Sequence, residues 1–483
     1  MKKYILIILC CLKSFPLWSY NVNMIVEHYS VDQGLPNNTV NCTLKDRDGF
    51  IWFGTWYGLC CFDGVKFKTF NKQEHDSDVP PRKIQRIVED KNGYIWVKTI
   101  DRKLYVFNKV TECFHAVYDD MKNYSENIQV IKLQNTAEGD VLLLTKDKNL
   151  LLAGVDEKGQ VTIKILFDSR NEINKHDYTL KHHVLCETEE YISWIGTDYK
   201  VAAVHKGSEL ASRPADFITS KINSGDKDSF TSFFEDGRKV WVGDRAGIFY
   251  SIDVRTGLVN RYVLSEIKGA ISNLLVTPAG YVYLSVAGQG TYEYDLAERR
   301  LQKINTEMND AMVTHAFIDQ YDKIWFHENE KALIYYDPLN HTAKRFPFTM
   351  FGKITTLYSE DAGERGLFFL SPAGEAWLFD REHAEMVYIN KLKQLSNDRA
   401  NQQFYHLMLD NDGVLWLSSA DEGVYCMNFP KKQFNLLSLS PQSVGQENYA
   451  TGVRALFQSK SGDIWVGTRW QSVYRMDRNG VTK

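Results

Sequence analysis

An apolar segment with an aromatic residue near its centre recurs along the chain. The segment DGFIWFGT contains Trp52, and similar segments follow as NGYIWVKT, GRKVWVGD, DGVLWLSS and GDIWVGTR. The spacings between Trp52 and Trp465 average about 46 residues, a period typical of propeller blades and of helical repeats. The central residues of the ten copies are Trp52, Trp96, Leu143, Trp194, Trp241, Tyr283, Trp325, Phe369, Trp416 and Trp465.

The content of one copy favours blades over helices. Around Trp52 the sequence predicts four short strands, NCTLKD, FIWFGT, LCCFD and KFKTF, which are separated by turns. Four short antiparallel strands per repeat are typical of a propeller blade. A helical repeat would need apolar residues at i, i+3, i+4 and i+7, and these segments are too short and too rich in Ile, Val, Phe and Trp. We therefore expect an all-β propeller whose blades bury their faces against one another.

The number of copies predicts more than one ring. Propellers typically close with four to eight blades, so ten copies exceed one common ring. We expect a seven-bladed ring over residues 23–346, followed over residues 347–483 by about three blades of an incomplete second propeller. The last copy stops after SVYRMD and RNGVTK, which leaves no room for a full outer strand.

The first 20 residues have the pattern of a secretory signal peptide. Lys2 and Lys3 precede an apolar run from Tyr4 to Leu12, and Lys13 closes that run. The run is shorter than the roughly 20 residues that a membrane-spanning helix needs, and no later segment is long and apolar enough. We therefore predict export.

Charge and cysteine content exclude some functions. The net charge is −4 and no basic run is present, so nucleic acid is not an expected partner. Six cysteines follow the predicted signal peptide and form no CxxC pair, which favours buried thiols over a disulfide or metal role. These residues are Cys42, Cys60, Cys61, Cys113, Cys186 and Cys426.

The segment from Val26 to Phe70 carries a family resemblance. With its motifs GLPNNTV, DGFIWFGT and FDG, it resembles the first blade of the periplasmic sensor region of hybrid two-component regulators, through which polysaccharide-degrading bacteria detect glycan fragments. The later segments LWLSSADEGVYCMNFPKKQFNLLS and VRALFQSKSGDIWVGTR also look like blades of that family.

The resemblance implies a periplasmic sensor with two seven-bladed propellers, an immunoglobulin-like domain, a membrane helix, a histidine kinase and a response regulator. It also implies an oligosaccharide ligand, a homodimer in the full-length sensor, and membrane attachment only through downstream segments. The sequence shows no membrane helix, kinase phosphoacceptor region or receiver aspartate. We therefore expect the amino-terminal, ligand-sensing part of such a regulator, without enzyme activity of its own.

The loops that follow the second strand of each blade are the expected binding surface. These loops open on the same end of the ring as the links between blades, and functional residues concentrate on such loops. Aromatic side chains suit the C–H faces of sugars, polar groups suit hydroxyls, and Arg suits a uronate or a sulfate. The candidate ligand-binding residues are Trp56, Tyr57, Arg102, Asp198, Tyr199, Arg245, Asn329, Asp421, Arg469 and Trp470.

Two other functions remain open from the sequence. The same loops could dock a polypeptide, and some propellers are glycan lyases or hydrolases, although no catalytic motif of such enzymes is present. No cofactor or metal is expected, because the acidic turns KDRDG, EDKNG and DNDG lack calcium-loop spacing and match hairpin turns.

Overall fold

The computed structural model divides the chain into two compact units, Met1–Phe429 and Pro430–Lys483. The structure describes residues 25–70, 81–169, 180–196, 200–207, 217–221, 230–304, 313–328, 331–351, 358–361, 363, 366–371, 375–391, 404–428, 453–460, 463–468 and 473–476. The predicted signal peptide over residues 1–20 lies outside these ranges. No helix within them is long and apolar enough to cross a membrane.

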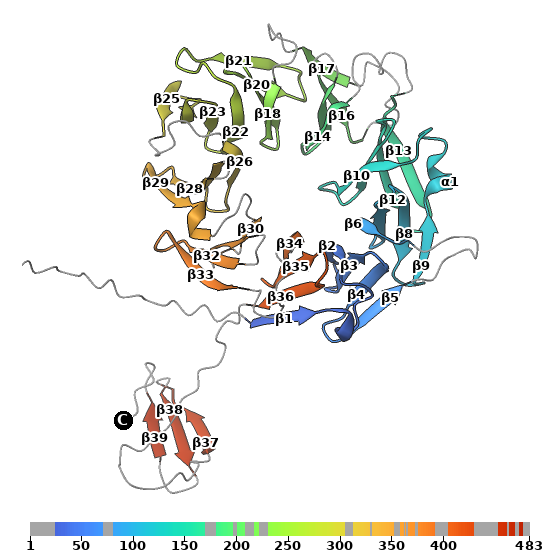
Figure 1. Ribbon diagram of the computed structural model, residues 1–483, viewed down its shortest axis with the longest axis vertical. Helices are drawn as coiled ribbons and strands as arrows, with labels where there is room; N and C mark the ends of the chain where they lie inside the picture. The colour runs from blue at the N-terminus through green and yellow to red at the C-terminus, as the bar shows by residue number, and fades with distance from the viewer. Residues whose placement is uncertain are drawn as a thin grey trace, which may run out of the picture. The chain divides into compact units, whose positions relative to one another are not determined.

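The first unit is built from antiparallel sheets arranged in a ring (Figure 1). Its described residues form nine four-stranded sheets, called blades 1 to 9 in chain order. The all-β propeller class predicted from the sequence is confirmed. The described residues also form the short helices η1 (Val31–Gln33), α1 (Tyr118–Met121) and η4 (Phe348–Phe351).

The strands of each blade follow one another in sequence. Blade 1 contains β2 (Val40–Lys45), β3 (Ile51–Thr55), β4 (Gly58–Phe62) and β5 (Phe67–Phe70); blade 2 contains β6 (Ile84–Glu89), β7 (Ile95–Thr99), β8 (Leu104–Asn108) and β9 (Cys113–Ala116); blade 3 contains β10 (Val130–Asn135), β11 (Val141–Thr145), β12 (Leu150–Val155) and β13 (Val161–Phe167). Blade 4 contains β14 (Leu180–Glu187), β15 (Tyr191–Gly196), β16 (Lys200–His205) and β17 (Phe217–Lys221); blade 5 contains β18 (Phe230–Glu235), β19 (Lys239–Asp244), β20 (Ile248–Asp253) and β21 (Val259–Val263); blade 6 contains β22 (Ile271–Val276), β23 (Tyr281–Val286), β24 (Gly290–Asp295) and β25 (Arg300–Lys303). Blade 7 contains β26 (Val313–Ile318), β27 (Ile324–Glu328), β28 (Ala332–Asp337) and β29 (Thr342–Pro347), and blade 8 contains β30 (Tyr358–Asp361), β31 (Leu367–Leu370), β32 (Glu375–Asp380) and β33 (Glu385–Lys391).

Blade 9 combines both ends of the first unit. Its strands β34 (Phe404–Leu409), β35 (Leu415–Ser419) and β36 (Val424–Asn428) come from the end of the unit, and β1 (Ile25–Tyr29) pairs antiparallel with β36. The second unit holds a separate three-stranded sheet of β37 (Val453–Gln458), β38 (Ile464–Thr468) and β39 (Val473–Met476).

The expected division near residue 346 is not where the structure divides the chain. Blades 8 and 9 belong to the same unit as blade 1, and Phe53 of blade 1 packs on Trp416 of blade 9 with ring centroids 5.8 Å apart. All blades offer similar apolar faces, so the repeat itself does not mark the blade at which a ring closes. The pairing of β1 with the edge of β36 shows that blade 9 is the blade at which the ring closes.

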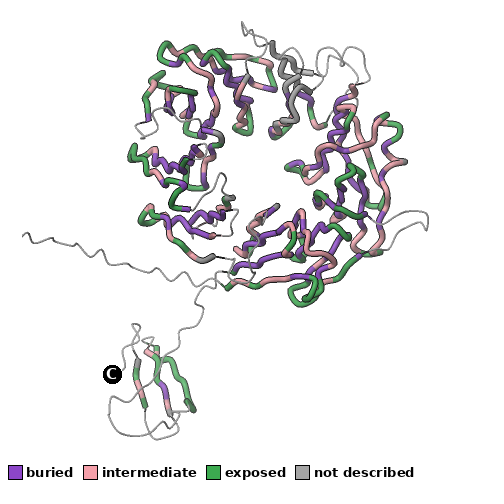
Figure 2. Tube along the Cα trace, in the orientation of Figure 1, coloured by how far each residue is buried: buried purple, intermediate pink, exposed green. Residues whose placement is uncertain are grey.

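The core lies between blades rather than inside one sheet. Trp52 of blade 1 shares a hydrophobic cluster with Ile84 and Phe107 of blade 2, and similar clusters join the other neighbouring blades. Buried residues accordingly recur in the strands around the ring (Figure 2). Three predicted central residues, Leu143, Trp194 and Phe369, pack against the preceding blade. In blades 3 and 8 the residues that face the following blade are Leu142 and Phe368. Because strand side chains alternate, a shift of one residue exchanges the two faces.

The acidic turns hold the tryptophans in place. Asp46 accepts the backbone N–H groups of Asp48 and Phe50 at 3.0 and 2.9 Å, and its other oxygen accepts the indole Nε1–H of Trp52 at 2.8 Å. The pairs Asp90–Trp96, Asp236–Trp241, Asp319–Trp325 and Asp410–Trp416 repeat the indole contact. The turn interpretation of these acids is therefore confirmed.

Candidate functional site

The loop end of the ring is tied together by backbone hydrogen bonds. The N–H of Trp56 donates to the carbonyl of Thr39 at 3.2 Å, within blade 1. Lys83, in the link to blade 2, donates to the Trp56 carbonyl at 2.9 Å and accepts from the N–H of Ile100 at 2.9 Å. The link through Lys83 therefore joins the loop of blade 2 to the loop of blade 1, which holds these two loops in fixed positions.

Trp56 and Tyr57 project from this end as exposed aromatic side chains. Their exposed fractions are 40% and 64%, whereas Trp52 in the same blade is 3% exposed. The Thr55 hydroxyl accepts the N–H of Tyr57 at 3.1 Å and fixes the turn. The ammonium of Lys83 lies 5.2 Å from the ring centroid of Trp56, so a cation and an aromatic ring are presented together.

The other candidate residues are distributed unevenly. Arg102 is exposed in the β7–β8 loop, next to the blade that carries Trp56. Asp421 is exposed in the β35–β36 loop of blade 9, which adjoins blade 1 on its other side, and Arg245 is exposed in the β19–β20 loop of blade 5. The structure therefore gathers Trp56, Tyr57 and Arg102 on neighbouring blades and leaves Arg245 apart. The remaining candidates lie outside the described residues: Asp198, Tyr199, Asn329, Arg469 and Trp470.

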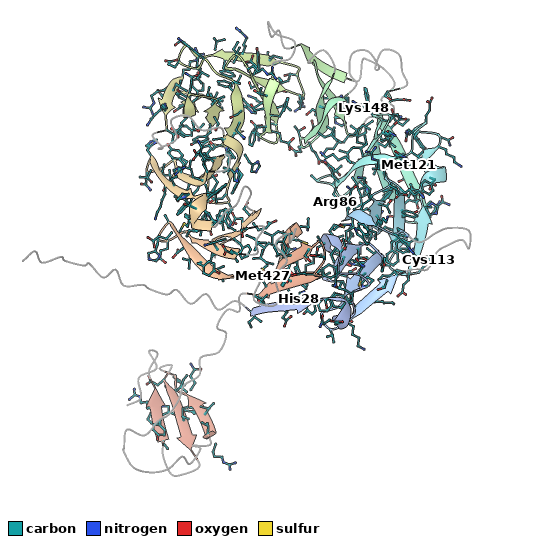
Figure 3. The ribbon with its side chains drawn as sticks, viewed as in Figure 1. His28, Arg86, Cys113, Met121, Lys148 and Met427 are labelled. Atoms are coloured by element: carbon teal, nitrogen blue, oxygen red, sulfur yellow. The ribbon has the colours of Figure 1, made fainter. Side chains whose placement is uncertain are left out.

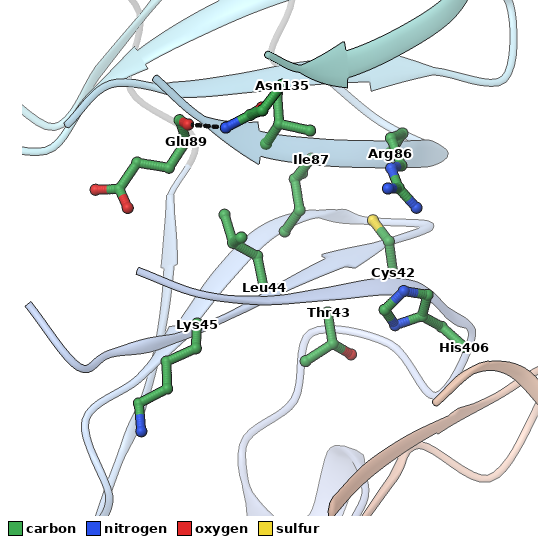
Figure 4. Close-up of a pocket in the computed structure, with 10 residues that line it drawn as sticks. Cys42, Thr43, Leu44, Lys45, Arg86, Ile87, Glu89, Asn135 and His406 are labelled. Atoms are coloured by element: carbon green, nitrogen blue, oxygen red, sulfur yellow. Dashed lines mark hydrogen bonds between the residues drawn. The ribbon is translucent and has the colours of Figure 1, made fainter. Parts of the chain in front are cut away.

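A cavity of about 400 Å³ lies along the innermost strands β2 and β6 (Figure 4). The sequence analysis did not identify its lining, in which Arg86, Cys42 and His406 from three different blades lie close together (Figure 4). Arg86 lies on the inner side of the ring (Figure 3). Each of the three residues follows a break in strand register that marks a β-bulge, and bulges redirect side chains. The only available sequence signal was the interrupted alternation in segments such as VNCTLK and IQRIVE.

The electrostatics of the cavity favour neutral forms of its thiol and imidazole. Burial raises the pKa of the Cys42 thiol to about 12. Burial, and then the nearby Arg86 guanidinium, lower the pKa of His406 to about 4. The buried Nδ1 of His406 has no hydrogen-bond partner. At neutral pH, Arg86 is therefore the cationic group among these three residues.

Three carboxylates lie near the turns that follow β2 and β6, at the end of the blades away from Trp56. A lysine lies among them. Oxygen atoms of Asp46, Asp48 and Glu89 lie within 4.8 Å of one another, a spacing at which a metal ion could bind. However, the Lys109 ammonium donates to these carboxylates at 3.0, 2.7 and 2.8 Å. Burial opposes the charge of Lys109, but these hydrogen bonds outweigh it and raise its pKa. The group is thus an ion-pair network between blades.

Buried thiols are found where the cysteine pattern predicted them. Cys42, Cys60 and Cys426 are buried, while Cys61 and Cys113 are partly buried. The Cys186 side chain lies outside the described part of the structure.

Comparison with known proteins identifies the repeat. The two-component regulator propeller model matches residues 34–57. The chain carries this regulator propeller repeat. The resemblance inferred from GLPNNTV and DGFIWFGT is thereby confirmed, and the matched segment ends on Trp56 and Tyr57. The comparison with curated proteins finds no match.

Solved structures of similar proteins include sensor domains. The extracellular domain of the putative hybrid two component system BT3049 from B. thetaiotaomicron is 17% identical, with coverage of 95% of this chain and 60% of that chain and a TM-score of 0.34. The extracellular domain of BT4673 from the same organism is 16% identical, with coverage of 95% and 66% and a TM-score of 0.31. Virginiamycin B lyase from Staphylococcus aureus is 8% identical, with coverage of 63% and 96% and a TM-score of 0.33. The chain therefore spans about 60% of the length of the first sensor domain.

Proposed function

We propose that this chain is the extracytoplasmic ligand-sensing region of a hybrid two-component regulator, and that it binds an oligosaccharide at the loop end of blades 1 and 2. The observation that carries the proposal is the regulator propeller repeat at residues 34–57, whose last two residues are the exposed Trp56 and Tyr57. The proposed location is the periplasm, with membrane attachment through other parts of the full-length protein.

The loop end has the properties that sugar binding requires. Flat aromatic faces cover the C–H surfaces of a pyranose, and a few fixed polar groups determine its orientation. Trp56 and Tyr57 supply the faces, while Arg102 and Lys83 supply donors from the next blade. The backbone bonds through Lys83 hold these loops before a ligand arrives, which reduces the entropy lost on binding.

Signal transfer would then depend on a difference in affinity between two states. A ligand shifts a conformational equilibrium only when it binds one state more tightly than the other. In a homodimeric, membrane-attached regulator, we propose that ligand bound at this end changes the relative positions of the protomers. The histidine kinase of the full-length regulator would perform the chemistry.

The proposal can be tested by calorimetry with an oligosaccharide panel and the Trp56→Ala variant. We expect saturable binding that is weakened about 30-fold by the substitution, as for a residue worth about 2 kcal/mol. Val65→Ala is a matched control, because Val65 is 81% exposed in the β4–β5 turn at the other end of blade 1. Absence of binding across the panel, or equal affinity of parent and Trp56→Ala, would contradict the proposal.

A further inference from the structure

Blade 2 places two cations opposite each other on neighbouring strands. Arg86 on β6 is the register partner of Lys98 on β7. Side chains of directly opposed residues lie on the same face, and like charges at such positions destabilise a sheet. The corresponding pairs in other blades contain no such charge pair: Cys42–Gly54, Lys132–Leu144, Ser232–Gly243, Asn273–Ser285, His315–His327 and His406–Ser418.

Lys98 is buried, and no carboxylate in the described part of the chain pairs with it. The residue is 6% exposed, and its ammonium donates to Gln85 Oε1 at 2.7 Å and to the Ile131 carbonyl at 2.8 Å, both neutral acceptors. Burial lowers the pKa of Lys98, and the charges of Arg102 and Arg86 lower it further. Arg86 and Arg102 are therefore each close enough to Lys98 to repel its charge.

Arg102 carries additional backbone strain. Its φ of 67° lies in the left-handed region, which costs a non-glycine residue about 1–2 kcal/mol. Gly58 occupies the corresponding third position after the second strand in blade 1, with φ 134°, and Gly247 occupies it in blade 5, with φ 81°. Blade 2 thus has an arginine at a position where glycine would relieve strain.

Lys83 is joined to the same loop, because its carbonyl accepts the N–H of Ile100 at 2.9 Å. We name the four residues Lys83, Arg86, Lys98 and Arg102 the blade 2 cationic cluster. None of the four forms an ion pair with a carboxylate in the described ranges of the chain. The nearby Asp101 is occupied by the Thr99 hydroxyl and by the Lys103 ammonium, 3.4 Å away. The described residues therefore provide no counter-charge for the cluster, although the net charge of the chain is −4.

We infer that the blade 2 cationic cluster binds the carboxylate or sulfate groups of an acidic oligosaccharide whose sugar face rests on Trp56. The inference rests on the proposed function and specifies its ligand class. A guanidinium group can pair with a carboxylate or sulfate through two parallel hydrogen bonds. A bound anion would also offset the repulsion between Arg86 and Lys98, for which the described residues provide no counter-charge.

The test compares acidic and neutral ligands on the whole chain by calorimetry at low and at raised salt. The acidic arm contains tetramers from polygalacturonate and polymannuronate and a sulfated chondroitin tetramer, which separates carboxylate from sulfate recognition. The neutral arm contains the methyl-esterified polygalacturonate tetramer and tetramers from arabinan, xylan and mannan. We expect an acidic ligand to bind at least about tenfold more tightly than the neutral ones, with a preference that falls as salt is raised.

Two substitutions test whether the blade 2 cationic cluster binds the acidic group of the ligand. Arg86→Gln and Arg102→Gly should each weaken the acidic ligand about tenfold and leave any neutral ligand within about twofold. Arg102→Gly also removes backbone strain, so loss of folding cannot explain a loss of binding. Arg238→Gln is the matched control, because Arg238 is exposed in the β18–β19 turn and its loss changes the net charge equally.

The outcomes separate the two proposals. Equal binding of acidic and neutral ligands, or acidic binding that both cluster variants leave unchanged, would overturn the ligand class while keeping the sensing function. Binding of neither arm would overturn both. Binding of the acidic arm that Arg238→Gln weakens as much as Arg86→Gln would show a general charge effect and would also overturn the assigned site.

Discussion

The ammonium of Lys109 in blade 2 lies 3.0 Å from Oδ2 of Asp46 in blade 1. That same carboxylate oxygen accepts the indole N–H of Trp52, so one aspartate joins a turn, a core tryptophan and the next blade. Arg381 of blade 8 reaches Asp319 of blade 7 at 2.6 Å in the same way. Neighbouring blades are therefore held by charge at their turn ends as well as by apolar packing.

Replacing Lys109 should destabilise the ring strongly. Lys109→Met leaves the Asp46 carboxylate, with 0% side-chain exposure, and Glu89, with 10%, without their shared cation. Removal of one partner of a buried ion pair costs roughly 3–5 kcal/mol, and we expect about 3 kcal/mol in the free energy of unfolding because Lys109 is partly exposed. Urea unfolding followed by circular dichroism measures the change.

The control for this variant is Lys68→Met. Lys68 pairs with Glu112 on the surface, with side-chain exposures of 60% and 42%, so its loss should cost less than about 1 kcal/mol. Equal destabilisation by both substitutions would show that the network around Asp46 has no special role.

The two tryptophans of blade 1 should differ sharply in their effect on stability. Trp52 is 3% exposed between blades 1 and 2, whereas Trp56 is 40% exposed. Trp52→Ala leaves a cavity and should cost roughly 3–5 kcal/mol, while Trp56→Ala should cost less than about 1 kcal/mol. Chemical unfolding of both variants checks this, and a similar loss for both would contradict the assignment of Trp56 to a binding surface.

The repeat made the blades predictable from sequence, but not their closure. The period, the short apolar strands and the Asp–Gly turns are local features, and the structure confirms them. Pairing of β1 with β36 joins segments at opposite ends of the unit, and similar blades offer similar edges, so no local signal selects this partner. Leu142 and Phe368 were missed for another reason: a run of apolar residues hides which face each side chain occupies.

The loop aromatics could be predicted because turns are exposed, whereas the residues in the cavity could not. Arg86 and His406 face inward because bulges shift the register of β6 and β34. In a sequence, the same residues look like ordinary polar positions of an alternating strand. Their convergence depends on neighbouring blades, and therefore on tertiary structure.

Stability should fall on acidification because of His406. Its pKa is about 4 in the folded protein and 6.5 in its unperturbed state, with burial as the main cause. Between these values the unfolded chain binds a proton that the folded chain does not. The stabilisation is therefore complete above pH 6.5 and is lost as the pH falls toward 4, by up to about 3 kcal/mol.

Comparison of the parent with His406→Asn isolates this contribution. The difference in unfolding free energy between the two proteins should change across pH 6.5 to 4, because carboxylate titrations common to both cancel in the difference. Parallel pH profiles over that window would show that His406 is not buried in its neutral form.

A new cysteine on β1 should form a disulfide with a native cysteine on β36. Glu27 is the register partner of Cys426 in the antiparallel pair, and such partners have Cα atoms about 4.5–5.5 Å apart, within the range that a disulfide spans. Glu27→Cys should therefore give a peptide linked through residues 27 and 426 in non-reducing mass spectrometry. Val26→Cys is the control, because Val26 pairs with Met427 and alternate residues point to opposite faces. A ring closed near residue 346 would instead place β1 beside blade 7, and Glu27→Cys would then form no bond with Cys426.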